Sequence, residues 1–251
     1  MFDWIKRLAA VSALALVAAC GGGDDDHPPP GTLAQVATTG GFTALVAAAD
    51  KAGLVPALSS SSASLTVFAP TDAAFTSLAT SLGFADAGAM VAALDGPTLA
   101  SILQYHVLPT KKLAADLVAG GPTQDTLYTF DGAAATLALD TTSGVKITDE
   151  VLTQATVTTA NVPASNGVIH VIDKVLVPPG VLNVVQMAQA NPAFSTLVGA
   201  VVSADLQGAL ADPSARLTVF APTNDAFAAI ASTVQGLTPA QLTTVLTYHV
   251  L

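Results

Sequence analysis

The sequence predicts an α+β fold, in which helices come before strands within a unit that begins to repeat. Two observations lead to this prediction. In residues 32–179, apolar residues first recur at helical intervals and then give way to short valine- and threonine-rich runs broken by glycine, asparagine and aspartate. Long stretches of this unit also return further along the chain, which indicates two tandem globular domains rather than a solenoid.

Three motifs occur twice along the chain, in the same order. The first two are separated from their second copies by one common offset, and the third by a slightly shorter one. The second copy is therefore shorter between the last two motifs, where a loop or helix edge can vary in length. The motifs are FTALVA and FSTLVG from Phe42 and Phe194, LTVFAPTDAAF and LTVFAPTNDAF from Leu65 and Leu217, and LQYHVL and LTYHVL from Leu103 and Leu246.

The first half of domain 1, residues 32–179, is expected to hold helices around two short strands. A buried strand from Leu65 ends at Pro70, and Thr71 or Asp72 is well placed to cap the helix that follows. The expected helices lie at residues 42–54, from 72 onward, and at 86–94, 97–103 and 111–118, and the expected strands lie at residues 65–68 and 105–108.

The second half of domain 1 is expected to form most of the sheet. Asp131 and Gly132 predict a turn, and Asn166 and Gly167 turn the chain into a closing run that is apolar on both faces, as in a central strand. His170, within that run, is expected to be half-buried. The expected strands lie at residues 127–130, 136–139, 145–147 and 155–158 and in the closing run 165–179.

Three stretches of domain 1 resemble the signature stretches of the fasciclin domain family. They are the Tyr105–His106 pair, TVFAPTDAAF from Thr66 and NGVIHVIDKVLVPP from Asn166, and they occur in the family's order over residues 32–179. The resemblance implies a twisted β-sandwich or wedge with helices packed along it. It also implies a protein outside the cell or on its surface, because the family occurs in adhesion and matrix proteins and is not known for catalysis. In some animal members, the tyrosine–histidine stretch has been linked to integrin binding.

The tyrosine–histidine pairs are the candidate interaction residues. They are Tyr105 with His106 in the first copy and Tyr248 with His249 in the second. An aromatic residue in a strand is also a common core residue, so a buried Tyr105 is the alternative. The residues interpreted as structural are Pro70, Asp72, Asn166, Gly167 and His170.

Catalysis finds little support among these residues. A serine nucleophile needs a neighbouring histidine oriented by a carboxylate, and no G-x-S-x-G elbow is present. Thr71, Asp72 and His106 are the only alternative triad. Because the residues around His106 are apolar, we expect a buried ring whose nitrogens bond backbone groups or Asp72. We therefore predict that the protein is not an enzyme.

Metal and cofactor sites are not expected either. Structural zinc needs cysteine and histidine at close, paired spacings, and the four histidines are far apart. No phosphate-binding glycine loop precedes a helix. Residues 24–27, Asp-Asp-Asp-His, are interpreted as part of a solvated spacer. A net charge of −10, with no basic stretch, also argues against binding nucleic acid.

The N-terminus has the pattern of a lipoprotein signal peptide. Lys6 and Arg7 precede a short apolar run, which ends in Val-Ala-Ala before the single cysteine, Cys20. This resembles a bacterial lipobox, with residues 1–19 removed and Cys20 lipidated. Residues 20–31, rich in glycine, aspartate and proline, are expected to form a tether. Gly21 after the cysteine points to the outer membrane or cell surface, by resemblance to Gram-negative sorting.

Residues 180–251 are expected to be an incomplete second domain. They hold counterparts of the early motifs but none of the late strands, so the strand at residues 217–220 is expected to keep an open edge. We predict that this segment does not fold stably alone.

Two functions remain open from the sequence. The first is surface adhesion or matrix interaction with a protein, a glycan or another copy of the chain. The second is binding of a small apolar or glycan ligand in the cell envelope, which would require an apolar pocket.

Overall fold

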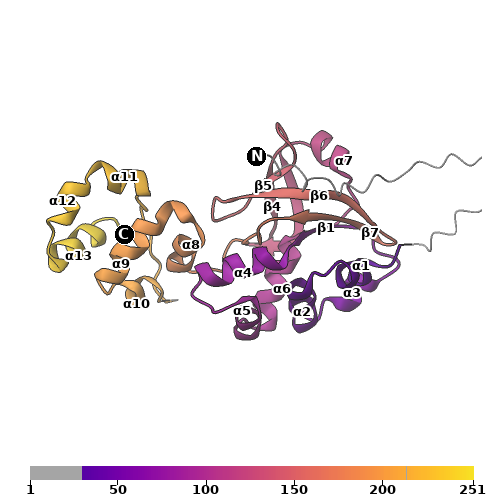
Figure 1. The fold of residues 1–251 in the computed structure, drawn as a ribbon, viewed down its shortest axis with the longest axis horizontal. Helices are drawn as coiled ribbons and strands as arrows, with labels where there is room; N and C mark the ends of the chain where they lie inside the picture. Colours follow the sequence, from indigo (N-terminus) through magenta and orange to yellow (C-terminus); the bar gives the residue numbers. More distant parts are fainter. Residues whose placement is uncertain (1–29, 213) are drawn as a thin grey trace, which may run out of the picture.

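The computed structural model describes residues 30–212 and 214–251. The predicted signal peptide, Cys20 and the tether through residue 29 lie outside the described residues. The chain forms two parts (Figure 1): domain 1 holds the sheet and helices α1–α7, and domain 2 is a smaller group of helices, α8–α13. None of the helices in the described ranges combines the length and the apolarity needed to cross a membrane.

Helices come first and strands later in domain 1, as the α+β prediction requires. The helices are α1 (Leu33–Thr39), α2 (Thr43–Lys51), α3 (Val55–Ser59), α4 (Asp72–Ser81), α5 (Ala87–Ala93), α6 (Gly96–Tyr105) and α7 (Ala114–Ala119). The strands are β1 (Leu65–Pro70), β2 (Val107–Leu108), β3 (Thr123–Phe130), β4 (Ala133–Asp140), β5 (Lys146–Thr148), β6 (Gln154–Ala164) and β7 (Gly167–Ile172).

Side-chain caps fix where several helices begin. Thr71 accepts a hydrogen bond from Ala74 N–H at 3.2 Å, so it caps α4, and Asp72 is the first helical residue. Thr32 and Gln35 form a capping box at the start of α1. Helices α1 and α3 were not predicted from the sequence, because both are short and lack a long apolar period.

The seven strands form one sheet in the order β2-β1-β7-β6-β5-β4-β3. Strand β1 pairs in parallel with β7, and the other neighbouring strands pair antiparallel. The predicted turn at Asp131 and Gly132 is confirmed: both residues have positive φ angles, 49° and 81°, as a two-residue hairpin between β3 and β4 requires.

Strand β7 is central and buried, as predicted, but it ends at Ile172, so the rest of the expected run through residue 179 is not a strand. It lies between β1 and β6, and Gly167 at its start faces Leu65 of β1. A Cβ atom at Gly167 would lie 2.3 Å from Leu65 O, so the close approach of these two backbones requires glycine. His170 is fully buried rather than half-buried, because its ring packs against Phe68 and bonds Lys112 O and Asn161 N–H.

The expected strand at residues 105–108 is only partly correct. Helix α6 runs through Tyr105, His106 is its C-cap, and the strand consists of Val107 and Leu108 alone. The helical apolar spacing of Leu99, Ile102 and Leu103 continues, so the helix runs two residues further than Leu103.

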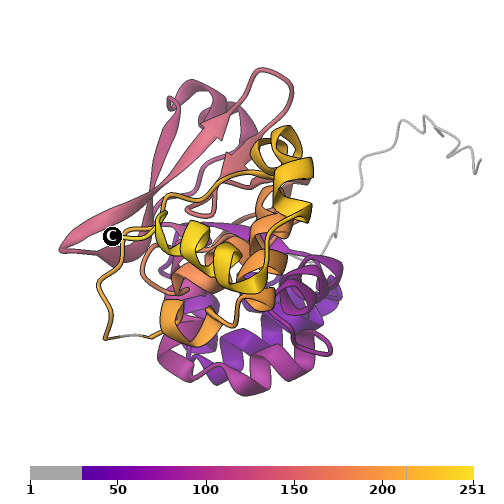
Figure 2. The ribbon, with the colours of Figure 1, turned by 90° about the vertical axis from the view of Figure 1, so that its left-hand side faces the viewer.

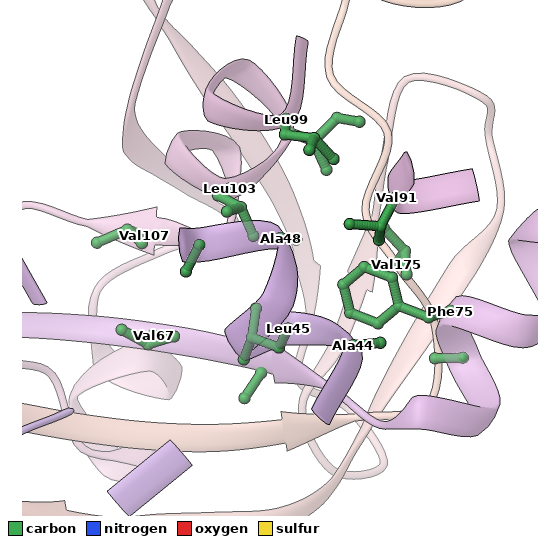
Figure 3. Close-up of a cluster of buried hydrophobic side chains, with 14 of the residues drawn as sticks. Ala44, Leu45, Ala48, Val67, Phe75, Val91, Leu99, Leu103, Val107 and Val175 are labelled. Carbon is green, nitrogen blue, oxygen red and sulfur yellow. The ribbon is translucent and has the colours of Figure 1, made fainter. Parts of the chain in front are cut away.

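Two apolar clusters hold domain 1 together, one on each face of the central strands. The first joins α2, α4, α5 and α6 to β1; Leu45, Phe75 and Leu103 point into it (Figure 3). The second packs Phe68 and Tyr105 against the late strands. Viewed from the end nearest domain 2, the late strands lie on one side of domain 1 and the early helices on the other (Figure 2).

Domain 2 packs around its own small cluster of Leu197, Val201, Phe227 and Leu246. Asn191 anchors it to domain 1 by donating to Val151 O at 2.8 Å. Its helices are α8 (Val184–Ala190), a 3₁₀ turn (Pro192–Phe194), α9 (Ser195–Ser203), α10 (Gln207–Leu210), α11 (Asn224–Ala229), α12 (Ala231–Gln235) and α13 (Pro239–Thr247).

Candidate functional site

His106 is buried and both of its ring nitrogens are used by backbone groups. Nδ1 lies 2.8 Å from Ile102 O, and Nε2 accepts a hydrogen bond from Leu176 N–H at 2.8 Å. A backbone N–H can only donate, so the ring must be neutral with its proton on Nδ1. Burial lowers the His106 pKa from 6.5 to about 4, although the bond to Ile102 acts in the opposite direction. As predicted, backbone groups thus bond both nitrogens of this buried ring.

Tyr105 is also buried, with 2% of its surface exposed. Its hydroxyl donates to Thr136 O of β4 at 3.1 Å, and its ring packs edge-on against Tyr128 of β3 with centroids 6.3 Å apart. Burial raises the Tyr105 pKa, and the charges of Asp149 and Glu150 raise it further. Tyr105 and His106 therefore join α6 to the late strands, and a partner on the surface would not reach either side chain.

The second copy of the pair is placed differently. Tyr248 is 88% exposed, and His249 is partly exposed. His249 keeps the local bond of its counterpart, because Nδ1 lies 2.8 Å from Val245 O. The sequence suggested equal roles for the two copies, but only the second presents its tyrosine to solvent.

Asp72 joins two helices instead of contacting His106. Its carboxylate accepts hydrogen bonds from Thr43 Oγ1 and from Ala44 N–H, the latter at 2.9 Å, and so caps α2. Burial opposes ionisation, but these hydrogen bonds lower the Asp72 pKa overall. Asn224 repeats the arrangement in domain 2, accepting from Thr196 N–H at 2.9 Å.

The triad of Thr71, Asp72 and His106 does not form. Thr71 caps α4, Asp72 caps α2, and His106 bonds backbone groups of α6 and the closing segment. No proton path joins a hydroxyl, an imidazole and a carboxylate among these three residues. In the described residues, no group of three or more metal-ligating side chains comes together.

Asn166 and His170 hold the closing segment against the helices. Asn166 accepts from Leu33 N–H at 2.8 Å and donates to the carbonyls of Leu58 and Ser60 at 2.9 and 2.8 Å. It thereby ties α1 and α3 to the start of β7. His170 bonds Lys112 O at 2.9 Å, and burial lowers its pKa.

Asp149 is a buried polar residue that sequence reasoning missed. Its carboxylate accepts from Val177 N–H at 3.0 Å and from Thr153 N–H at 3.1 Å, so it fastens the β5–β6 turn to the closing segment. Burial raises the Asp149 pKa, against the effect of these bonds. A single aspartate in a loop gives no sequence signal, because its partners are distant along the chain.

An apolar cavity of about 200 Å³ lies between the early helices and the sheet. Its walls come from α1–α3, α6, β1, β2 and β7, with Leu127 of β3, and the polar side chains among its lining are Thr38, Gln104 and His106. Large apolar side chains are also exposed on the surface of domain 1. They include Leu113 and Val118 at α7 and Leu127 and Phe130 on β3.

Comparisons with known proteins agree with this architecture. A model of the fasciclin domain matches residues 40–178 and 192–251. The chain is similar to protein sll1483 of Synechocystis (40% identical over 141 residues, covering 55% of this chain and 68% of that protein). It is also similar to Synechocystis protein sll1735 (37% over 136 residues, covering 54% and 88%).

Two further similarities are more distant. Human periostin is 28% identical over 168 residues, which cover 64% of this chain and 17% of periostin. A FAS1 domain pair from the insect cell adhesion molecule fasciclin I shares 17% identity over 87% of this chain and 71% of that one, with a TM-score of 0.38. Because the family model matches two segments that make up most of the sequence, the chain belongs to the fasciclin domain family.

Proposed function

We propose that this chain is a non-catalytic adhesion or matrix-interaction protein of the cell envelope. Fasciclin domains are known from adhesion proteins at cell surfaces. The observation that carries the proposal is how the polar signature residues are used. Asp72, His106 and His170 all bond within the fold, whereas large apolar side chains are exposed on α7 and β3. This geometry favours contact through the surface over catalysis by these polar residues.

The partner is a protein or glycan surface, or a second copy of the chain. We place the protein in the envelope, at the outer membrane or cell surface, through a lipid on Cys20 and the tether of residues 20–31. The body of domain 1 begins where that tether ends, because Ser165 N–H donates to Gly31 O at 3.0 Å. Two linked domains would strengthen such contacts by avidity.

The test is an adhesion assay with cells that display the whole chain. We expect Val118→Asp or Phe130→Asp to weaken binding to other cells or to coated matrix. Tyr105→Phe removes only a buried hydroxyl and serves as the control that leaves the surface unchanged. Circular dichroism would confirm that each variant is folded. If wild-type cells do not adhere, or if both aspartate variants adhere as wild type does, contact through α7 and β3 is wrong.

The cavity of domain 1 favours a second candidate function, the binding of a small apolar ligand. Protein interiors hold few voids larger than a water molecule, and an apolar cavity of about 150 Å³ suffices to bind benzene. The cavity here is somewhat larger, at about 200 Å³, and almost wholly aliphatic. A charged or sugar-like ligand would find few hydrogen-bond partners in it.

Thermal unfolding with benzene or indole as the probe tests this second function. We expect a rise in Tm for the wild-type chain, because ligand that binds only the folded state stabilises it. Ala37→Leu places extra volume in the cavity wall and should abolish the rise, whereas Ala93→Leu, at an exposed position of α5, should leave it. An equal rise in all three proteins would place the probe elsewhere.

A further inference from the structure

The apolar cavity of domain 1 is elongated. Its lining comes from α2 and from the two helices that contact α2 on opposite sides in Figure 1, α3 and α6. An α-helix with its side chains is about 10 Å across, so a space that reaches both neighbours of α2 extends over about that length. Leu65 and Val67, two residues apart on one face of β1, line it on the side of the sheet. Because its volume is only about 200 Å³, a space of this length is narrow.

Three polar side chains line the cavity, and they differ in what they can offer a ligand. Both ring nitrogens of His106 are taken by backbone groups. The hydroxyl of Thr38 donates its proton to the carbonyl one helical turn earlier, at 2.8 Å. The side-chain amide of Gln104 bonds no other residue that the structure describes, and this residue is partly exposed. Gln104 therefore offers both a donor and an acceptor where the cavity meets solvent.

None of the lining residues carries a charge. A carboxylate or an ammonium group in this space would lose water without gaining a partner of opposite charge, which is costly. A hydroxyl or another uncharged polar group, in contrast, can bond the amide of Gln104. The polar end of a ligand is therefore expected to be neutral.

The rest of the lining is aliphatic. It consists of leucine, valine, isoleucine and alanine side chains, and no phenylalanine, tyrosine or tryptophan offers a ring face on which an aromatic ligand could stack. An apolar cavity of about 150 Å³ holds the six carbon atoms of benzene, so a cavity of about 200 Å³ holds about eight carbon atoms. A narrow aliphatic space of this capacity fits a straight alkyl chain better than a ring.

We propose that this cavity binds a linear alkyl chain of about eight carbon atoms that ends in a hydroxyl or another uncharged polar group, with that group at Gln104. This ligand class rests on the second candidate function, the binding of a small apolar ligand in domain 1. It adds the shape of the ligand, its length and the chemistry of its polar end.

The test is a titration of the whole chain with straight-chain alcohols, followed by NMR of the isoleucine methyl groups. Ile169 lines the cavity, whereas Ile147 belongs to the second apolar cluster of domain 1. We expect the methyl resonance of Ile169 to shift and that of Ile147 to stay unchanged. The affinity should rise about fourfold per methylene from 1-butanol to 1-octanol, because each added methylene is buried, and should then level off.

Two further ligands with eight carbon atoms test shape and charge. Cyclooctanol keeps the hydroxyl but should bind at least about fivefold more weakly than 1-octanol, because a wide ring strains the walls of a narrow space. Octanoate at neutral pH should bind at least about tenfold more weakly, because its carboxylate would lie unpaired beside an uncharged lining.

Variants of Gln104 test the polar end. Gln104→Leu removes the amide and keeps the bulk, so it should weaken binding of 1-octanol about twofold to tenfold and leave binding of benzene unchanged. Gln104→Lys should bring octanoate binding above that of 1-octanol, because the ammonium group pairs with the carboxylate. Gln154→Leu, at an exposed position of β6 outside the cavity, is the matched control and should change neither ligand.

The alkyl-chain ligand is wrong if 1-octanol binds no tighter than 1-butanol, if cyclooctanol or octanoate binds as well as 1-octanol, or if the Ile169 methyl does not shift. Benzene and indole separate this failure from that of the second candidate function. A rise in Tm with either probe, together with any of these results, keeps apolar binding and overturns the alkyl chain. No rise with benzene, indole or 1-octanol overturns both.

Discussion

Acidification is expected to destabilise domain 1 through His106. The neutral ring donates from Nδ1 to Ile102 O and accepts at Nε2 from Leu176 N–H. A second ring proton would remove the acceptor that Leu176 needs and would place a charge in an apolar core. Burial accordingly lowers the His106 pKa to about 4 in the folded protein.

The sign and size of the effect follow from linkage. In the unfolded chain the ring takes up a proton below its ordinary pKa of 6.5, whereas the folded ring stays neutral down to about pH 4. The stability contributed by the neutral ring is therefore complete above about pH 6.5 and is lost as the pH falls through this window. At about 1.4 kcal/mol per pH unit, the loss amounts to about 3 kcal/mol.

His106→Gln isolates this contribution. Glutamine keeps a side-chain donor and acceptor but cannot titrate, so the variant should be less stable at neutral pH by about 1–3 kcal/mol. His170 also has a lowered pKa and Asp149 a raised one, and both act equally in the wild type and the variant. The difference in stability between the two proteins should therefore shrink as the pH falls.

Urea unfolding at a series of pH values measures this difference. Near-ultraviolet circular dichroism of the packed Tyr105–Tyr128 pair reports on domain 1 specifically, because Tyr248 of domain 2 is exposed. If the free energies of unfolding of the wild type and His106→Gln fall in parallel between about pH 7 and pH 4, the ring is not held neutral by the fold.

Three further changes have defined outcomes. Gly167→Ala should destabilise domain 1 by at least about 2 kcal/mol in urea unfolding, since its Cβ would overlap the facing carbonyl, whereas Gly199→Ala in α9, with open space around it, should not destabilise domain 2. Asp72→Asn should cost less than about 1 kcal/mol, because Asn224 already fills this role in domain 2, while Asp72→Ala should cost about 1–2 kcal/mol by losing the cap. Cys20→Ser should move the protein from the membrane fraction to the soluble fraction of cells, and retention in membranes would refute the lipid anchor.

The features that were predicted correctly from the sequence are those that depend on residues close together in the chain. The strand from Leu65, the cap at Thr71 and the Asp131–Gly132 turn each depend on a few neighbouring residues, and the structure contains all three. The central place of β7 also follows from its own composition, because a strand that is apolar on both faces must be covered on both.

Long-range contacts account for what the sequence did not predict. Tyr105 lies in a run that is suited to either a helix or a strand, and its burial depends on Thr136 and Tyr128 in the late strands. Asn166 was expected only to turn the chain, yet it also bonds backbone groups near α1 and α3. The partners of Asp149 are likewise assembled only by the fold.

The two copies of the tyrosine–histidine pair show what this motif requires. In domain 1 the pair lies between α6 and the late strands, so its polar atoms need Thr136 O and Leu176 N–H from segments that follow it in the sequence. In domain 2, α13 reproduces the helix and the bond from the histidine to its own helix. The tyrosine is nevertheless exposed, because the helix fixes only half of the surroundings that bury it. The burial of the pair in domain 1 therefore depends on the sheet that packs against α6, and Tyr248 is exposed because no such sheet covers α13 among the described residues.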